Sequence, residues 1–148
     1  MPANDGDPLR VVFTNGVFDL FHIGHQHLLS RAAEGARRLV VAVNSDGSTQ
    51  RLKGDSRPVQ LCATRIENVT RFLESLDLPA GFLVRSFEGD TPEEIIHAVQ
   101  PDVLIKGSDS PRPLAGEEFV LSHGGSVRII ERLPGYSTSA IIEGSITA

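Results

Sequence analysis

Cysteine, tryptophan and long apolar runs are scarce or absent in this sequence of 148 residues. Its one cysteine, Cys62, excludes an intramolecular disulfide and a zinc site built from several cysteines. No apolar run approaches the roughly 20 residues that a membrane-spanning helix needs, and residues 1–10 lack the basic and then apolar segments of a secretory signal peptide. We therefore expect a cytoplasmic protein that has no membrane partner.

Lysine is also scarce, because the 14 basic residues include only Lys53 and Lys106. The formal net charge of −5 argues against general binding of nucleic acid, which needs a basic face. It is compatible with a small anion that is held locally. In a chain that otherwise uses arginine, each lysine can mark a position that needs a compact point charge. Chance is the alternative explanation.

The length and an apolar fraction of 40% fit one domain, which we place at residues 9–148 after a flexible segment at 1–8. Apolar runs without strict alternation predict strands that are buried on both faces of a parallel sheet. The strands are expected at residues 9–14, 39–44, 82–87, 102–106 and 126–131. Helical patterns lie between and after them, at residues 24–38, 63–76, 92–99, 113–123 and 137–146.

This alternation predicts a single-domain α/β fold with a doubly wound, Rossmann-like parallel sheet. Right-handed crossovers favour the five-stranded order 3-2-1-4-5. In that order the first and fourth strands are neighbours. The chain segments that follow these two strands pass to opposite faces of the sheet. Ligands of such sheets bind at the carboxyl ends of these strands.

The tetrapeptide His22-Ile23-Gly24-His25 follows the first strand and opens a helix. The N-terminus of a helix attracts anions through its unpaired N–H groups and its dipole. Imidazoles at this point can donate hydrogen bonds to charge that develops on a phosphate. A metal pair, a helix cap and a solvated surface are alternative interpretations of these four residues alone.

Other polar segments follow the remaining strands. Lys106-Gly107-Ser108-Asp109 ends the fourth strand, and Gly135-Tyr136-Ser137-Thr138-Ser139 leads into the last helix. Residues 51–58, with three cations, form a predicted loop after the second strand that could close over a triphosphate. An N-cap and a solvated basic loop are the alternatives for the last two segments. Together, the segments predict a polyphosphate site at one edge of the sheet.

With these residues in view, the chain resembles the cytidylyltransferase-like nucleotidyltransferases of the HIGH superfamily. The matching pieces cover nearly the whole chain: FTNGVFDLFHIGHQHLL, RLKGDSRPV, Arg65, DTPEEII, PDVLIKGSD and GYSTSAII. Within the family, RLKG, KGSD and GYSTS are most similar to the adenylyltransferases that make ADP-heptose from ATP and heptose 1-phosphate. The chain differs from those enzymes at residues 62–64, 77–90 and 110–113, and Arg132 before GYSTS resembles the cytidylyltransferases instead.

The resemblance implies that a substrate phosphate attacks the α-phosphorus of a nucleoside triphosphate and releases pyrophosphate. It implies catalytic roles for His22, His25, Lys53 and Arg65, and Asp19 is expected to brace the histidine loop rather than bind metal. It also implies Mg²⁺ with the nucleotide and a homodimer, and leaves the metal ligands unknown. The nucleotide-binding residues that it implies are Thr14, Asn15, Gly16, Phe18, Gly24, Lys106, Gly107, Asp109, Tyr136, Ser137, Thr138 and Ser139.

Several other functions stay open at the level of sequence. Among enzymes, these are a cytidylyltransferase for glycerol 3-phosphate or another small phosphate ester, and an FAD synthetase. A nucleotide-binding regulator without turnover keeps the same motifs, and class I aminoacyl-tRNA synthetases share the HIGH sequence. The remaining histidines, His27, His97 and His123, lie outside the motifs, and we expect surface or packing roles for them.

Overall fold

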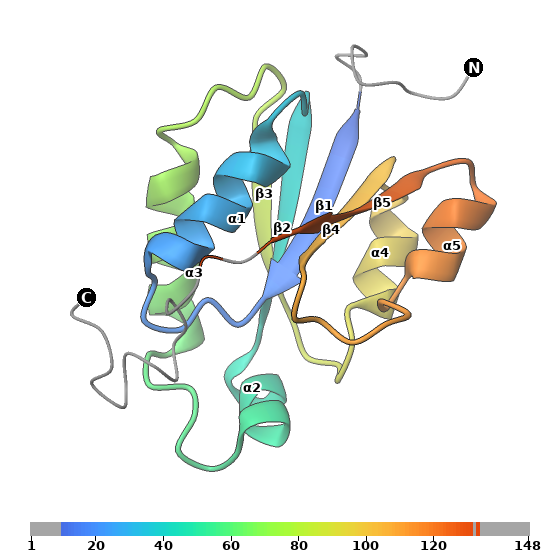
Figure 1. Ribbon diagram of the computed structural model, residues 1–148. Helices are drawn as coiled ribbons and strands as arrows, with labels where there is room; N and C mark the ends of the chain where they lie inside the picture. Colours follow the sequence, from blue (N-terminus) through green and yellow to red (C-terminus); the bar gives the residue numbers. More distant parts are fainter. Residues whose placement is uncertain (1–9, 132, 134–148) are drawn as a thin grey trace.

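The computed structural model describes residues 10–131 and 133, which form a central sheet covered by helices (Figure 1). The strands are β1 (Val11–Gly16), β2 (Arg38–Asn44), β3 (Phe82–Phe87), β4 (Val103–Gly107) and β5 (Ser126–Ile130). The helices are α1 (Ile23–Ala33), α2 (Asp46–Lys53), α3 (Cys62–Leu73), α4 (Glu93–Val99) and α5 (Glu117–Ser122). No helix in these described ranges is long and apolar enough to cross a membrane.

The sheet has the order β3-β2-β1-β4-β5 and all of its strands are parallel, which confirms the predicted topology. Strand β1 lies at the centre, where Phe13 pairs with Val40 of β2 and with Leu104 of β4. All three side chains are almost completely buried. This explains why the strand sequences are continuously apolar rather than alternating.

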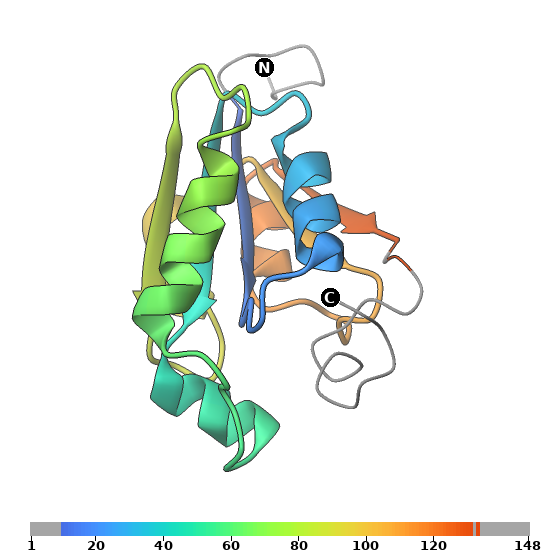
Figure 2. The ribbon, with the colours of Figure 1, turned by 90° about the vertical axis from the view of Figure 1, so that its left-hand side faces the viewer.

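Each face of the sheet packs against its own pair of helices. On one face, Val12 and Val41 pack in a core with Leu29 of α1 and Val69 of α3. On the other face, the core joins Phe13, Val40 and Leu104 of the strands to Ile96 of α4 and Val120 of α5. Figure 2 shows the first pair of helices on one side of the sheet and the second pair behind it. The connections therefore diverge between β1 and β4, as a doubly wound sheet requires.

Helix α2 was not predicted, because residues 51–58 were expected to form a loop from their start. The structure instead places Arg51 and Lys53 in the last turn of α2, and the helix ends at Gly54. Ser45 caps the helix by accepting a hydrogen bond from the N–H of Ser48 at 3.0 Å. The helix lies at the carboxyl edge of the sheet, outside the two packed layers (Figures 1 and 2).

Several element ends also differ from the prediction. Helix α1 ends at Ala33 rather than at residue 38, since Gly35 has a φ of 74° and Arg38 already belongs to β2. Strand β1 extends to Gly16, two residues beyond the expected end at residue 14. Helix α5 begins at Glu117 instead of residue 113, because Gly116 has a φ of 80°. The predicted helix at 137–146 lies outside the described residues.

Candidate active site

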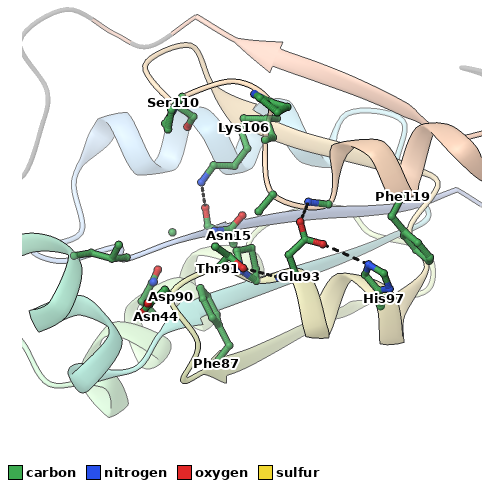
Figure 3. Close-up of a pocket in the computed structure, with 18 of the residues that line it drawn as sticks. Asn15, Asn44, Phe87, Asp90, Thr91, Glu93, His97, Lys106, Ser110 and Phe119 are labelled. Atoms are coloured by element: carbon green, nitrogen blue, oxygen red, sulfur yellow. Dashed lines mark hydrogen bonds and ion pairs between the residues drawn. The ribbon is translucent and has the colours of Figure 1, made fainter.

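Two cavities adjoin at the carboxyl ends of β1 and β4, where the topology predicts a ligand. The larger has a volume of about 920 Å³ and the smaller about 470 Å³. Both are lined by the same central residues, which are Asn15, Gly16, Val17, Lys53, Lys106 and Ser110. Figure 3 shows the larger cavity, with Lys106 and Ser110 on one side, His97 and Phe119 on another, and Asn15 and Glu93 between them. A molecule in one cavity can therefore meet a molecule in the other at this shared edge.

The two histidines of the tetrapeptide line the smaller cavity and cap α1 reciprocally. Nδ1 of His22 accepts a hydrogen bond from the backbone N–H of Gly24 at 3.0 Å, and Nδ1 of His25 accepts one from the N–H of His22 at 3.2 Å. The rings stack with their centroids 3.7 Å apart. Since both Nδ1 atoms accept, the proton of each neutral ring lies on Nε2. Capping of α1 by the two histidines is thus compatible with a role at a phosphate. It fixes the tautomer in which Nε2 of each ring carries the proton and can act as the donor.

Burial lowers the pKa of His25 to about 3, and the neighbouring His22 lowers it as well, while Asp19 opposes the change. The His25 ring is also held between the ring of Phe18, edge-on at 5.3 Å, and that of Phe21, stacked at 5.5 Å. At neutral pH this imidazole is therefore an uncharged N–H donor with a fixed orientation. Such a donor can stabilise charge that develops on a phosphate without itself carrying charge.

The loop between β1 and α1 holds a strained backbone that places these rings. Phe18 and Leu20 have φ values of 54° and 51°, a left-handed conformation that residues other than glycine seldom adopt. A Cβ at Gly16 would lie only 3.1 Å from the ring of Phe18, so the close approach of this ring requires glycine. Strain of this kind is concentrated at functional sites, where the surrounding structure maintains it.

Asp19 ties this loop to the segment before α3. Its buried carboxylate accepts hydrogen bonds from the backbone N–H of Val59 at 2.7 Å, from that of Gln60 at 2.9 Å, and from Nε of Arg57 at 3.1 Å. Burial alone would raise the pKa of Asp19, but the hydrogen bonds from Val59, Gln60 and Arg57 outweigh it and lower the pKa. Asp19 therefore braces the histidine loop, the role that the sequence indicated.

Arg65 does not occupy the position that the sequence predicted. Its side chain is fully buried and lines neither cavity. The guanidinium donates to the carbonyl oxygens of Gln60, Val17 and Asn44 at 2.8 to 2.9 Å, and to Asp46 Oδ1 at 2.9 Å. These contacts indicate a positioning role for Arg65, and the catalytic role that the resemblance implies stays a prediction. Arg65 joins the ends of β1 and β2 to the start of α2.

We expect Arg65→Met to lower the free energy of unfolding by about 3 kcal/mol, because it leaves buried carbonyls and part of a carboxylate without donors. Denaturant unfolding measures this change. Arg71→Met is the matched control, since Arg71 is exposed and pairs only with Glu67 on the same helix. That surface pair contributes less than about 1 kcal/mol. A stable Arg65→Met protein that has lost turnover alone would instead support the catalytic role that the resemblance implies.

The two lysines face the same edge from different elements. Lys53 comes from the end of α2, and Lys106 comes from β4, where its Nζ donates to the carbonyl oxygen of Asn15 at 2.9 Å. Burial lowers the pKa of Lys106 to about 8, while Asp109 raises it and Lys53 lowers it. The rarity of lysine in the sequence thus corresponds to a pair of cations at the junction of the two cavities.

The other predicted residues divide into four groups. Asn15 and Gly16 line both cavities, whereas Thr14 lines neither, because its hydroxyl is buried in the sheet and donates to the carbonyl oxygen of Ile105 at 2.7 Å. The Thr14 hydroxyl is therefore already engaged within the sheet, and its nucleotide-binding role stays a prediction. The smaller cavity also includes Phe18, Gly24, Gly107 and Asp109. Outside the described residues lie Arg132, Tyr136, Ser137, Thr138 and Ser139.

The far wall of the larger cavity contains residues that the sequence did not single out. Among them are Phe87, Glu93 and Phe119, together with His97, for which we had expected a surface or packing role. His97 does pack, since its ring stacks on Phe119 with centroids 4.0 Å apart, but it also lines the cavity. In the sequence, the only indication of these cavity residues is the polar first turn of α4. The same residues are expected at the start of an ordinary helix.

Metal binding by the protein alone is not apparent in residues 10–131 and 133. In that part of the chain, no group of three or more His, Cys, Asp or Glu side chains is arranged to hold a metal ion. Mg²⁺ that accompanies a nucleoside triphosphate needs few protein ligands, because phosphate oxygens and water complete its coordination. The donor set present is compatible with such a nucleotide-bound ion.

Solved structures with the same fold support this description. A lipopolysaccharide core biosynthesis protein from Thermoplasma volcanium is 27% identical, with a TM-score of 0.62, and the match covers 84% of this chain and 97% of that one. Pantothenate synthetase from Thermus thermophilus is 13% identical, with a TM-score of 0.53 over 92% of this chain and 65% of that one. The second similarity concerns the fold alone.

The chain is more similar in sequence to two bifunctional proteins than to these solved structures. The chain is 47% identical to the bifunctional protein HldE of Rhodopseudomonas palustris over 138 residues, which are 93% of this chain and 27% of that protein. It is 48% identical to HldE of Salmonella enteritidis over 90% of this chain and 27% of that one. The chain thus spans about a quarter of the length of these relatives. The family model described as cytidylyltransferase-like matches residues 13–144, and the chain therefore belongs to the cytidylyltransferase-like family.

Proposed function

We propose that the chain is a nucleotidyltransferase that joins the NMP group of a nucleoside triphosphate to a sugar phosphate and releases pyrophosphate, with ATP and heptose 1-phosphate as its substrates. The observation that carries the proposal is the pair of adjoining cavities, with the histidine pair in one and two lysines at their junction. Family membership supports the reaction type. The similarity to HldE and to a lipopolysaccharide core biosynthesis protein supports a sugar acceptor.

In this proposal the phosphates of the nucleotide occupy the smaller cavity and the acceptor occupies the larger one. The smaller cavity holds the start of α1 and the two histidines, which suit an anion. The acceptor's phosphate oxygen attacks the α-phosphorus in line with the departing pyrophosphate. This oxygen is already anionic, so a general base contributes little, and positioning and charge stabilisation dominate.

The residues then have distinct roles. His22 and His25 donate from Nε2 to the phosphate oxygens of the nucleotide, and Lys106 and Lys53 hold the two anionic reactants at the junction. Asp19 and Arg65 act only through the loops that they fix. Mg²⁺ enters with the triphosphate as part of the substrate. We extend the proposal to a homodimer, which the family resemblance implies, and to a cytoplasmic location, which was expected from the sequence.

The larger cavity favours a polyhydroxylated acceptor. Its lining combines the carboxylates of Glu118 and of Asp90, which also pairs with Arg51, with the rings of Phe87 and Phe119. Carboxylates accept hydrogen bonds from hydroxyl groups, and aromatic rings pack against the apolar face of a sugar ring. The lysines at the junction of the two cavities suit the phosphate of the same molecule. A flavin acceptor offers fewer hydroxyl donors to this lining.

The test is a matrix of pyrophosphate release in which ATP and CTP are each combined with heptose 1-phosphate, glycerol 3-phosphate and flavin mononucleotide. We expect turnover with ATP and heptose 1-phosphate. Turnover only with CTP and glycerol 3-phosphate would replace both substrates in the proposal but keep the reaction. Binding of triphosphate without pyrophosphate release for any acceptor would contradict an enzyme and favour a nucleotide-binding regulator.

A further inference from the structure

Glu93, the first residue of α4, links its own helix to the connection between β4 and α5 beside the larger cavity. Its Oε1 atom accepts a hydrogen bond from the backbone N–H of Gly116 at 2.6 Å. Its Oε2 atom lies 3.4 Å from Nε2 of His97, one turn further along α4. Figure 3 shows both interactions. The carboxylate therefore contacts the connection between β4 and α5 as well as its own helix.

The backbone at Gly116 packs closely against α4. Gly116 has a φ of 80°, and a Cβ there would lie 2.6 Å from Cδ1 of Ile96, which is fully buried in α4. The connection thus packs directly on α4, with the carboxylate of Glu93 as its polar anchor. Glu117, the first residue of α5, also holds the connection. Its carboxylate accepts a hydrogen bond from the N–H of Leu114 at 2.9 Å and pairs with Arg112.

This connection, residues 108–116, contributes to both cavities. Asp109 and Ser110 line the smaller one, while Leu114 and Gly116 line the larger one. It also contains residues 110–113, where the sequence differs from the heptose enzymes that it resembles. The contact at Gly116 therefore holds one end of a segment whose residues 110–113 differ from those enzymes. On the other side of Glu93, the stacked rings of His97 and Phe119 continue the same wall.

We propose that Glu93 is a positioning residue for the acceptor, because it holds residues 108–116 and the His97–Phe119 stack in place as the far wall of the larger cavity. The inference rests on the proposed function, since it takes that cavity as the acceptor site. The wall lies away from the histidine pair and the start of α1. The anchored end of the connection, with Leu114 and Gly116, lines the larger cavity only, whereas Asp109 and Ser110 lie further along the chain from the anchor. Loss of the anchor is therefore expected to affect acceptor binding more than nucleotide binding.

The test compares Glu93→Ala, Glu93→Gln and the control Glu94→Ala in the full chain. Glu94 carries the same charge in the same first turn of α4 but lines neither cavity. With heptose 1-phosphate and ATP, we expect Glu93→Ala to raise the KM of the acceptor about tenfold, the scale of one charge-assisted hydrogen bond. The KM of ATP stays within about twofold. Glu93→Gln keeps an oxygen that accepts from Gly116, so its acceptor KM stays near that of the unchanged protein.

Amide hydrogen exchange gives a second measurement that does not depend on turnover. We expect the Gly116 amide to lose protection in Glu93→Ala and to keep it in Glu93→Gln. The Leu114 amide, bound to Glu117, stays protected in both and is the internal reference. Failure of the unchanged protein to release pyrophosphate would refute the proposed function, whereas exchange would still decide whether Glu93 anchors the loop.

Three results would overturn the positioning role. If Glu93→Gln loses as much acceptor affinity as Glu93→Ala while Gly116 stays protected, the charge itself contacts the acceptor. If Glu93→Ala raises the KM of both substrates equally, the change disturbs the whole site. An unchanged acceptor KM in Glu93→Ala, with Gly116 exposed to exchange, would likewise separate the anchor from acceptor binding.

Discussion

Replacing His25 by asparagine is expected to lower kcat by a factor of at least ~10², the usual scale for one preorganised donor that stabilises developing charge. Asparagine places an oxygen near the position of Nδ1, so it can still accept the hydrogen bond from the His22 N–H that measures 3.2 Å. The Nε2 donor is lost. The substitution thus separates the capping of α1 from the donor role, which alanine would remove together.

The measurement is steady-state pyrophosphate release combined with thermal unfolding. We expect the melting temperature of His25→Asn to stay close to that of the unchanged protein, because the cap is retained. His123→Asn is the control, since His123 is exposed at the end of α5 and lines neither cavity. Near-normal turnover of a folded His25→Asn protein would remove His25 from the mechanism.

The pH dependence of the same reaction reports the charge of His25. Because burial lowers its pKa to about 3, the imidazole is already neutral at pH 5. Turnover should therefore show no step from this residue between about pH 5 and 7, where an unperturbed histidine would titrate. A step near pH 6.5 that disappears in His25→Asn would indicate a charged imidazole and contradict the neutral donor.

The fold was largely predictable because its strands are buried on both faces, and burial leaves a continuous apolar signal in the sequence. Helix α2 was missed for the opposite reason. Its sequence, DGSTQRLK, is almost entirely polar, and the helix lies at the sheet edge rather than in a packed layer. The Ser45 cap was its only local signal. An apolar pattern detects helices that cover a core, and α2 covers none.

The site was predictable where a residue's type is unusual for its position, as with the histidine pair and the two lysines of an arginine-rich chain. It was not predictable for Arg65 and Thr14. A guanidinium or a hydroxyl binds a phosphate and a backbone carbonyl with the same donors, so the sequence cannot distinguish them. Only the three-dimensional structure places Arg65 among carbonyl oxygens and Thr14 against Ile105.

The second large effect is expected from Lys106→Met, which should lower kcat/KM by about 10² to 10³, because it removes a cation from the junction of the two reactants. Lys106 is mostly buried and contacts the carbonyl oxygen of Asn15. An anionic oxygen at the junction offers Nζ a stronger partner than this carbonyl, since charge-assisted hydrogen bonds are about twice as strong as neutral ones. Lys53, at the exposed end of α2, is the comparison residue.

The sign of the pH dependence follows from burial, which lowers the pKa of Lys106 to about 8. The ammonium is present below this pH and is lost above it, so kcat/KM should fall on the alkaline side with an apparent pKa near 8. A bound phosphate stabilises the charged form, and the corresponding fall in kcat should therefore lie at higher pH. Arginine at this position stays charged, so Lys106→Arg should show no fall in this range.

Lys53→Met distinguishes the two lysines in the same pH series. The positive charge of Lys53 lowers the pKa of Lys106, so its removal should shift the alkaline fall in kcat/KM to higher pH without abolishing it. Lys106→Met should abolish the fall, because the group that titrates is gone. An alkaline fall that persists near pH 8 in Lys106→Met would assign the titration to another group. Such a result would also contradict the proposal that Lys106 binds both nucleotide and acceptor at the junction of the two cavities.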